Sequence, residues 1–520
     1  MNNTEKYTPT IGKNVIENLT IGMYDDPRFV YREYVQNAAD QIDVAKRQNL
    51  YQSENEPSIY IQINTDTKTV IIEDNATGIE SQKVFSLLGN IAQSTKNKYE
   101  DKGFRGIGRL GGLGYCEKLI FETSFYGENQ KSTMTWNAKQ LKEIINNDDI
   151  KIGAAELISL ITDYSFSDTD ENSHYFKVTM ENVTNDILLD VQQVRDYLSM
   201  VAPVPFANHF THKNKIYNNA KDKNIVIDEY NIYVNTDQLF KGYNNYIYKN
   251  NEIWEENTII DVAFFEEYYK EELLFWGWCG ISKEMNQIPD ENKSRGIRLR
   301  KSNIQIGTET RLDDYHKEFV GNRYFIGEIY AINQELIPNA RRDFFIDNDE
   351  CFQFVRRLKE VFIRIHGFYY DISKKNAANK AKQDLKDKSE KIKDKTLSAE
   401  VKEKLSVEIK KLEKKVSEAQ KSLPRLLNKY QNKDVALYNV LESGIKDFGF
   451  DFSQEKEEKK QEEKQQYQQQ NTQSTTPGNS LPSQEEMISK KVVYKVLRQN
   501  LIKATAEELI QKIEEELKNE

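Results

Sequence analysis

The sequence contains little cysteine and no long apolar run, and both shortages restrict what the protein can be. Its three cysteines, Cys116, Cys279 and Cys351, are far apart and odd in number, so neither a zinc ribbon nor a disulfide framework is expected. The most apolar stretches, such as residues 273–281, are far shorter than the ~20 residues that a membrane span requires. Residues 1–13 lack the apolar core of a signal peptide. We therefore expect a soluble, cytoplasmic protein without membrane contact.

An excess of positive charge is also missing. The 520 residues carry 73 Lys and Arg against 83 Asp and Glu, which gives a net charge of −10. The protein as a whole is therefore not a basic nucleic-acid binder, although a local basic patch is compatible with that sum. Apolar and aromatic side chains are plentiful, including 29 Tyr and 24 Phe. A chain of this length exceeds a single core, which predicts two or three domains.

Periodic patterns in the first part of the chain predict a mixed α/β domain over residues 1–190. Apolar residues recur at three and four positions over residues 11–46, which indicates helix. Four strands are expected, at residues 58–64, 69–73, 119–124 and 175–180. The first of these, SIYIQIN, alternates apolar and polar side chains as a half-buried strand does. Helices between antiparallel strands predict a mixed α/β layered domain.

A second α/β region is expected over residues 191–372. Strand-like runs and one helix are expected at residues 224–234, 296–306, 324–332 and 352–365. Trp276 and Trp278 lie in an apolar stretch and are expected in the core of this region. His209 and His212 stand three residues apart, but no third ligand accompanies them, which argues against a metal site.

After residue 372 the composition changes to Lys, Glu, Asp and Ala. Residues 373–432 are expected to form coiled-coil helices or a helical hairpin, because an apolar seam repeats at four and three positions. The seam consists of Leu405, Ile409, Leu412, Val416, Ala419 and Leu423, and Pro424 is expected to end the helix. Its lysines are expected to be solvated, with contact to a phosphate backbone as the alternative.

The last part of the chain is expected to be a tether and a docking element. A short connector covers residues 433–454, and a disordered linker rich in Gln, Glu and Lys covers residues 455–483. Residues 484–520 are expected to form a helical C-terminal module with capping-box signals. We expect this module to bind a protein partner.

Three motifs carry the chemistry, and the first is REYVQNAAD at residues 32–40. Glu33 and Asn37 stand four residues apart on a predicted helix and therefore share one face. A carboxylate at that position can polarise a water molecule, and a carboxamide oxygen suits Mg²⁺, which prefers oxygen ligands. Taken alone, such a pair is more often a solvated helix face.

The second motif, EDNATGI at residues 73–79, directly follows the predicted strand 69–73. Asp74 at a strand end can accept a hydrogen bond from a purine amino group. Gly78 lets the backbone pass close to the base. Taken alone, the pattern is simply a turn.

The third motif, KGFRGIGRLGGLG at residues 102–114, has six glycines between residues 103 and 114. Their backbone N–H groups are unobstructed and can wrap phosphate oxygens, and the segment can move as a lid. Ser94, Thr95 and Lys96 add hydroxyls and an ammonium group for a terminal phosphate. Neither a Walker A loop nor a dinucleotide fingerprint fits this spacing. A merely flexible loop is the alternative.

In this order, the three motifs resemble the N, G1 and G2 boxes of the GHKL ATPases, the superfamily of DNA gyrase B, the ninety-kilodalton heat-shock chaperones, histidine kinases and MutL. The resemblance implies a Bergerat-type α/β sandwich that binds ATP, followed by an α/β transducer or middle domain, a coiled coil and a small helical C-terminal module. The presence of Glu33 argues against the histidine-kinase branch, which lacks this base.

The resemblance also implies roles for individual residues. Glu33 would be the general base, Asn37 the Mg²⁺ ligand and Asp74 the reader of adenine, while Lys96 would act with Glu33 in catalysis. The other nucleotide-binding residues would be Asp40, Gly78, Ile79, Ser94, Thr95, Gly103, Arg105, Gly106, Ile107, Gly108, Arg109, Leu110, Gly111, Gly112, Leu113 and Gly114. A late threonine contact to adenine is either Thr123 or Thr179.

A fourth motif, LIPNARRD at residues 336–343, is similar to the middle-domain loop of the heat-shock chaperones. In that loop an Asn is followed three residues later by an Arg that reaches the γ-phosphate, so Arg342 is the predicted catalytic arginine and Arg341 the alternative. A structural ion pair is the other interpretation of both. The glycine box is spaced more like that of bacterial MORC-like ATPases.

These resemblances predict an ATP-driven conformational switch with ATP and Mg²⁺ as ligands. The closed form is expected to associate as a homodimer, with the coiled coil holding the two chains. It would act on a nucleic acid or a protein partner, as in a bacterial antiviral defence system. The alternatives are a chaperone-like ATPase for client proteins and a nucleotide-sensing scaffold with little turnover.

Overall fold

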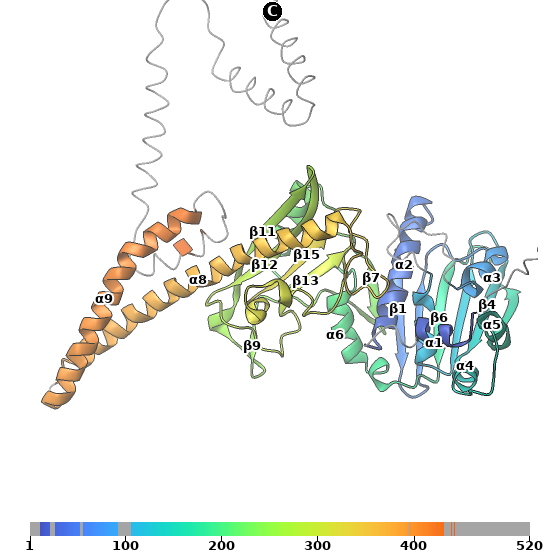
Figure 1. The fold of residues 1–520 in the computed structure, drawn as a ribbon, viewed down its shortest axis with the longest axis horizontal. Helices are drawn as coiled ribbons and strands as arrows, with labels where there is room; N and C mark the ends of the chain where they lie inside the picture. The colour runs from blue at the N-terminus through green and yellow to red at the C-terminus, as the bar shows by residue number, and fades with distance from the viewer. Residues whose placement is uncertain are drawn as a thin grey trace, which may run out of the picture. The chain divides into compact units, whose positions relative to one another are not determined.

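The computed structural model describes residues 11–20, 26–51, 56–91, 106–394, 396–430, 438 and 441–442, all within one compact unit, Met1–Phe450. Its first large element is a sheet of eight described strands (Figure 1) in the order β5-β4-β3-β6-β2-β1-β7-β8. The strands are β1 (Ser58–Asn64), β2 (Thr69–Asp74), β3 (Lys118–Ser124), β4 (Gln130–Asn137), β5 (Thr162–Asp168), β6 (Tyr175–Glu181), β7 (Asn231–Val234) and β8 (Asp237–Gln238). Neighbours are antiparallel except β1 and β7, which pair in parallel. The four predicted N-terminal strands are confirmed as β1, β2, β3 and β6.

Helices share an apolar core with one face of this sheet. In β1, Ile59, Ile61 and Ile63 join that core, while the residues between them are exposed, as the two-residue period predicts. The helices that contribute to the core are α1 (Asn14–Thr20), α2 (Phe29–Arg47), α3 (Ser81–Gly89), α4 (Ala138–Ile145), α5 (Ala154–Ile161) and α6 (Val191–Val201). A layer of helices on a sheet is the α/β sandwich that the sequence predicts.

A second sheet follows in the order β11-β12-β15-β13-β14. Its strands are β11 (Ile259–Tyr269), β12 (Glu272–Ser282), β13 (Gly296–Lys301), β14 (Ile304–Gln305) and β15 (Ile326–Ala331). Trp276 and Trp278 of β12 are fully buried, as predicted, in a core that includes α7 (Lys213–Asp222). The smaller elements are β9 (Tyr248–Lys249), β10 (Glu252–Ile253) and the 3₁₀ turns η1 (Gly108–Gly114), η2 (Asp186–Leu188), η3 (Glu255–Asn257), η4 (Asp313–Tyr315) and η5 (Phe319–Tyr324).

The strand predicted at residues 224–234 is shorter than expected and belongs to a different sheet. Only β7 is a strand there, and it pairs with β1 of the first sheet instead of joining the second. Its residues Ile232 and Val234 are buried in the N-terminal core. The apolar period of a strand does not name its partner, so the pattern was compatible with either sheet. The domain boundaries at residues 190 and 372 stay predictions.

Two long helices follow the second sheet. Helix α8 (Asp349–Lys391) begins three residues earlier and extends much further than the predicted 352–365 helix, and α9 (Ala399–Tyr430) packs back along it (Figure 1). Within the chain these helices form a hairpin, one of the two forms that the apolar seam predicts. The prediction that Pro424 ends the helix is wrong. Helix α9 continues because Leu427 and Tyr430 beyond the proline are buried, and the Tyr430 hydroxyl donates to Asp371 of α8 at 2.6 Å.

The predicted linker at residues 455–483 and the predicted module at residues 484–520 lie outside the described residues, as does most of the connector 433–454. Among the helices that the structure does describe, none combines the length and apolar character needed to cross a bilayer.

Candidate functional site

Helix α2 carries a polar stripe beside its buried apolar face. Val30 and other apolar residues at three- and four-residue spacing pack into the sheet core. Glu33, Asn37 and Asp40 follow one another along a single face of the helix. The Glu33 side chain is buried, and its Oε1 accepts a hydrogen bond from Nη2 of Arg32 at 3.1 Å. Asp40 is buried as well, whereas Asn37 is partly exposed, so oxygen acceptors line this edge of the helix.

The glycine-rich turn η1 lies directly against this stripe. A Cβ added to Gly108 would lie 2.2 Å from Oε2 of Glu33, so only glycine lets the backbone approach that carboxylate. The hydroxyl of Tyr34 donates to the carbonyl of Arg109 at 2.9 Å and accepts the N–H of Gly112 at 3.2 Å. These contacts fix the turn over the part of α2 that carries Glu33. Tyr34 belongs to the first motif, but the sequence alone assigns it no role in the site.

Arg109 connects the glycine-rich turn with the end of α3. Its guanidinium donates to the carbonyl oxygens of Gly106 and Asn90, both at 2.6 Å. Burial lowers the pKa of Arg109 to about 10, which still leaves the group cationic at neutral pH. The turn therefore includes a positive charge, which favours an anionic ligand nearby.

The second motif forms a tight turn at the end of β2. Asp74 is buried, and its Oδ1 accepts the N–H of Ala76 at 3.1 Å. Gly78 has a φ of +66°, and a Cβ added there would lie 1.8 Å from the carbonyl oxygen of Ser124. Both the backbone conformation and the available space therefore require glycine. The turn presses against the end of β3, so the packing of the protein's own backbone requires this glycine.

A tyrosine that no motif predicts stands near Asp74. The Tyr51 hydroxyl is buried and has no hydrogen-bond partner among the described residues. Burial raises its pKa, and the charges of Asp74 and Asp43 add to the effect. An orphaned buried hydroxyl beside a buried carboxylate is what a polar ligand can satisfy. Because Tyr51 only follows the end of α2, the sequence gives no signal for it.

The register of the sheet separates the two threonines predicted as adenine contacts. Asp74, Phe176 and Thr123 stand opposite one another across β2, β6 and β3, so their side chains share one face. Thr179 lies three residues along β6 from Phe176, and its side chain therefore points to the opposite face. The Thr123 hydroxyl accepts the N–H of Ile79 at 2.9 Å and donates to a β6 carbonyl. The fold thus brings Thr123, and not Thr179, to the turn after Asp74.

An arginine that follows the second sheet lies close to Glu33. Arg342 has a φ of +55°, a left-handed conformation that costs a non-glycine residue about 1–2 kcal/mol. Its carbonyl accepts the N–H of Gly307 at 2.8 Å, and its Nε lies 4.0 Å from Oε1 of Glu33. The Arg342 side chain is buried, whereas Arg341 is exposed. Of the two predicted arginines, Arg342 is the one that the fold brings to Glu33.

The residues along α2 fit a magnesium ion shared with phosphate groups. Such an ion usually keeps water and phosphate oxygens and takes only one or two oxygens from the protein. The partly exposed Asn37 carboxamide, one turn from Glu33, is a donor of this kind. Within the described residues no group of three or more His, Cys, Asp and Glu side chains could hold a metal. His212 instead has its Nε2 3.3 Å from the carbonyl of Ile259.

The other predicted residues fall into two groups. Five lie outside the described residues: Ser94, Thr95, Lys96, Gly103 and Arg105. Gly111 and Gly114 belong to η1, together with the glycines already described, and Ile107 directly precedes it. The side chains of Leu110 and Leu113 are buried in the apolar core, so only their backbone can face a ligand.

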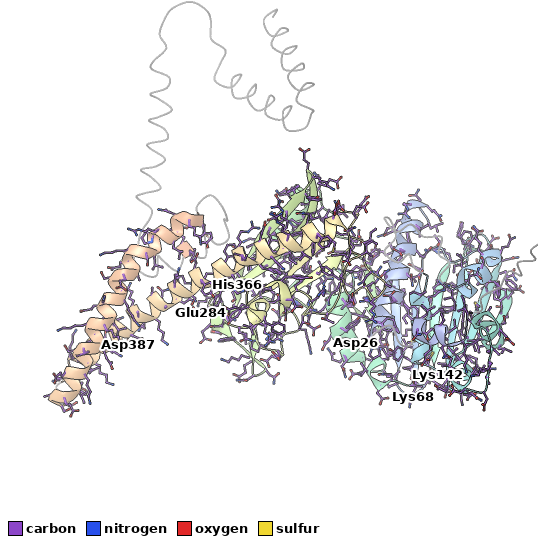
Figure 2. All side chains as sticks on the ribbon, viewed as in Figure 1. Asp26, Lys68, Lys142, Glu284, His366 and Asp387 are labelled. Carbon is purple, nitrogen blue, oxygen red and sulfur yellow. The ribbon has the colours of Figure 1, made fainter. Side chains whose placement is uncertain are left out.

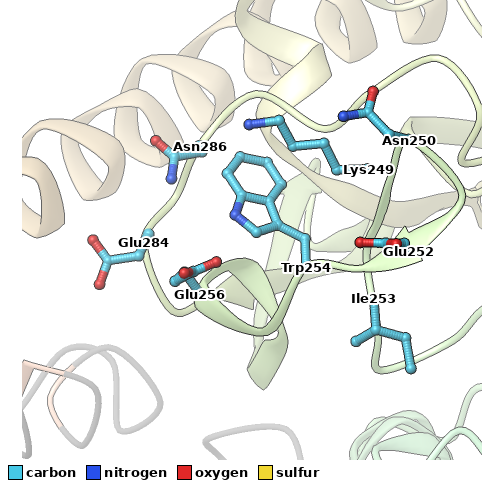
Figure 3. Close-up of a pocket in the computed structure, with 8 residues that line it drawn as sticks. All are labelled: Lys249, Asn250, Glu252, Ile253, Trp254, Glu256, Glu284 and Asn286. Atoms are coloured by element: carbon cyan, nitrogen blue, oxygen red, sulfur yellow. The ribbon is translucent and has the colours of Figure 1, made fainter.

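A separate pocket of about 600 Å³ lies beside the second sheet, and none of the predicted residues lines it (Figure 3). Its lining residues are Lys249, Asn250, Glu252, Ile253, Trp254, Glu256, Glu284 and Asn286. The Nζ of Lys249 lies 4.4 Å from the centroid of the Trp254 ring. These side chains are mostly exposed, so the pocket is shallow and solvated, unlike the cluster around Glu33.

Residues 28–174 match the family model described as Histidine kinase-, DNA gyrase B-, and HSP90-like ATPase. The matched range contains α2, the turn after β2 and the glycine-rich turn, which are the three motifs of the site. This part of the chain is therefore similar to the ATPase domains of the GHKL type, as the resemblance predicts.

The chain is also similar to bacterial proteins named Chaperone protein HtpG. It is 34% identical over 163 residues to HtpG of Buchnera aphidicola subsp. Cinara cedri (strain Cc), covering 28% of this chain and 25% of that protein. It is 26% identical over 159 residues to HtpG of Psychrobacter cryohalolentis, covering 26% and 24%. For HtpG of Burkholderia ambifaria the identity is 25% over 201 residues, covering 34% and 31%. The chain thus spans only about a quarter to a third of the length of these relatives.

Proposed function

We propose that this protein binds ATP with Mg²⁺, hydrolyses it, and uses the cycle as a conformational switch. The observation that carries the proposal is the meeting of Glu33 and Arg342, whose Oε1 and Nε atoms lie 4.0 Å apart. Glu33 belongs to a helix of the GHKL-type domain, and Arg342 follows the second sheet. A buried carboxylate and a buried guanidinium next to a glycine-rich turn supply a base and a cation for phosphoryl transfer to water.

Glu33 is the proposed general base. Its burial keeps bulk water away from the carboxylate, and the hydrogen bond from Arg32 fixes Oε1. The second oxygen, Oε2, faces Gly108 of the glycine-rich turn. From this position Glu33 would orient the attacking water and accept its proton, while Lys96 would bind the terminal phosphate.

Arg342 is the proposed sensor of the γ-phosphate. Its guanidinium lies beside Glu33, with Nε 4.0 Å from Oε1 of that carboxylate. A γ-phosphate carries more negative charge than one carboxylate, so it would draw Arg342 away and leave Glu33 to its water. Arginine at the phosphate stabilises the charge that develops during transfer. Because Arg342 follows the second sheet, its engagement would couple that region to the nucleotide state.

The adenine end of the site is proposed at the turn after β2. Asp74 would accept the amino group of adenine, with Gly78 beneath the ring and Thr123 holding the turn through Ile79. Asn37 would hold Mg²⁺, which neutralises phosphate charge when it is bound. In this proposal the adenine ring and the phosphates would lie at opposite ends of α2.

What the switch acts on is proposed from the relatives. Similarity to proteins named as chaperones favours client proteins as partners. Nucleic acid, a role in bacterial defence, a homodimer held by coiled-coil helices, a partner bound through residues 484–520, and a weakly hydrolysing scaffold are the alternatives. Suppression of client aggregation supports the first, DNA-stimulated hydrolysis supports a nucleic-acid clamp, and partner binding that Glu33→Ala leaves intact supports the scaffold.

Binding of ATP to Asp74→Asn and to Glu73→Gln tests the site directly. Asp74 points into the proposed adenine site, whereas Glu73 lies on the other sheet face and pairs with Lys177 at 3.1 Å. We expect Asp74→Asn to weaken ATP binding at least about tenfold, because a buried acceptor is lost, and Glu73→Gln to bind normally. Equal affinity in both variants, measured by calorimetry, contradicts the proposed orientation.

A further inference from the structure

Three charged side chains are fully buried between the second sheet and the N-terminal part of the chain. They are Lys241, which follows β8, Arg300 of β13 and Glu328 of β15. Nζ of Lys241 donates to Oε2 of Glu328 at 2.6 Å, and Nε of Arg300 donates to Oε1. Burial alone would raise the pKa of Glu328, but Arg300 and Lys241 outweigh it and lower that pKa to about 2. We call these three residues the ionic cluster.

Every remaining polar atom of the ionic cluster is directed at a specific partner. Lys241 also donates to Oδ1 of Asn303 at 2.7 Å and to the hydroxyl of Tyr330 at 2.9 Å, which uses all three ammonium protons. Buried ion pairs add little stability compared with apolar residues of the same volume, and their best-attested use is to specify one arrangement. A cluster bonded in this directed way selects one orientation of the parts it joins.

On one side, the ionic cluster and its neighbour Asn303 are hydrogen-bonded to elements that pack on α2. Nη2 of Arg300 donates to the carbonyl of Met200 at the end of α6, at 2.6 Å. Nδ2 of Asn303 donates to the carbonyl of Asp228, just before β7, at 2.6 Å. Helix α6 contacts α2, and the hydroxyl of Tyr230 donates to Asp43 of α2 at 2.7 Å. The cluster is therefore tied, through α6 and the start of β7, to the helix that carries Glu33.

The other side of the ionic cluster leads to Arg342. Arg300 stands directly opposite Gln305 in the β13–β14 hairpin. Two residues later, the N–H of Gly307 donates to the carbonyl of Arg342 at 2.8 Å. The backbone of Arg342 is therefore held by the residue that follows the short hairpin to which Arg300 belongs.

We infer that Lys241, Arg300 and Glu328 are positioning residues that hold Arg342 at Glu33 and transmit nucleotide state between the two sheets. The inference rests on the proposed function, since it gives the cluster a role in ATP hydrolysis. It also makes a geometric claim that does not depend on turnover: without the cluster, the second sheet loses its fixed orientation to the first.

The test uses Lys241→Met in the full chain, because this change removes one charge and leaves Arg300 paired with Glu328. Glu328→Gln is the second variant, and Asp261→Asn is the matched control. Asp261 is also buried and paired with a lysine, Lys215, at 2.6 Å. This pair joins β11 to α7 and does not connect the second sheet to the first. Each protein is assayed for kcat and ATP affinity. The distance between nitroxide labels at Gln62→Cys on β1 and Tyr268→Cys on β11 is also measured, since both positions are exposed.

We expect Lys241→Met to lower kcat about tenfold to a hundredfold through misplacement of Arg342, with ATP affinity changed less than about twofold, as uniform binding is not affected. The label distance should broaden in Lys241→Met and in Glu328→Gln, and stay narrow in Asp261→Asn. A narrow distance and normal kcat in both cluster variants overturn the inference. If the unmodified chain does not hydrolyse ATP, the proposed function fails, and the label distances still decide whether the cluster fixes the orientation. Should Glu328→Gln not fold, Lys241→Met alone decides.

Discussion

The Nε atom of Arg342 lies 4.0 Å from Oε1 of Glu33, although the two residues come from regions built on different sheets. The same carboxylate oxygen accepts a hydrogen bond from Arg32 at 3.1 Å. Arg342 adopts a positive φ to reach this place, and such strain concentrates at functional positions. The relationship links the conformation of the second region to the residue proposed as general base.

Replacement of Arg342 is expected to remove turnover without removing binding. Arg342→Ala should lower kcat about a thousandfold, the lower end of the effect of an arginine finger, while ATP affinity changes little. Arg341→Ala is the matched control, because Arg341 is adjacent but exposed, and it should keep normal kcat. Steady-state kinetics of the two variants measure the difference. An equal loss of kcat in both variants would contradict a specific role of Arg342 in hydrolysis.

Gly108→Ala is expected to lower kcat about a hundredfold by crowding Glu33. The added Cβ would lie 2.2 Å from Oε2, so either the carboxylate or the turn must shift, and a shift of about 1 Å can cost a hundredfold in rate. Gly367→Ala on α8 is the control, since nothing lies within 4 Å of its added Cβ. That control should gain about 0.5–1 kcal/mol in unfolding free energy, as a helical glycine replaced by alanine does. Normal kcat in Gly108→Ala contradicts the geometry.

The two threonines should respond differently to loss of their hydroxyl groups. Thr123→Val removes the acceptor for the partly buried N–H of Ile79, which should cost about 1 kcal/mol in stability and weaken nucleotide binding at the same turn. Thr179→Val lies on the opposite, half-exposed face of the sheet and should change both within about 0.5 kcal/mol. Urea unfolding and calorimetric ATP titration provide the comparison. A stronger effect of Thr179→Val on ATP binding would exchange the two assignments.

Acid is expected to destabilise the protein through buried histidines. His316 stacks on Phe362, with ring centroids 3.9 Å apart, and neither its nitrogens nor those of His366 (Figure 2) have a described hydrogen-bond partner. Burial, then His366, lowers the pKa of His316 to about 3, and burial also lowers the pKa of His366. The unfolded chain therefore binds protons first as pH falls below about 6.5.

It follows that the contribution of these two histidines to the free energy of unfolding is largest above pH 6.5 and declines as the pH falls toward 3. For His316 alone, the loss between pH 7 and pH 5 should be about 2 kcal/mol. Urea unfolding of the wild type and of His316→Asn at both pH values measures it. The variant should show a shallower decline, and an identical decline in both proteins would mean that His316 does not contribute.

Much of the site was predictable because local spacing encodes it. Glu33 and Asn37 share a face by helical period alone, and Asp74 and Gly78 follow a strand whose alternation is plain in the sequence. The nearness of Arg342 to Glu33 has no local signal, since it depends on the packing of two sheets. Tyr51 was missed for the same reason: its hydroxyl matters only because the fold buries it near Asp74.

The errors of sequence interpretation have physical causes as well. Strand β7 carries an ordinary alternating pattern, and only tertiary pairing with β1 decides which sheet it joins. The sequence predicts that Pro424 ends its helix, yet burial of Leu427 and Tyr430 against α8 outweighs the lost hydrogen bond. Local propensity sets a preference in both cases, and packing decides the outcome.

The most direct test of the account is Mg²⁺-dependent ATP hydrolysis by the purified chain and by Glu33→Ala, with ATP binding measured on both. The account predicts that the unmodified chain turns over ATP, and that Glu33→Ala binds ATP with similar affinity but loses at least about a hundredfold in kcat, the contribution of a general base. Turnover that survives in Glu33→Ala, or absence of ATP binding in the unmodified chain, would contradict it.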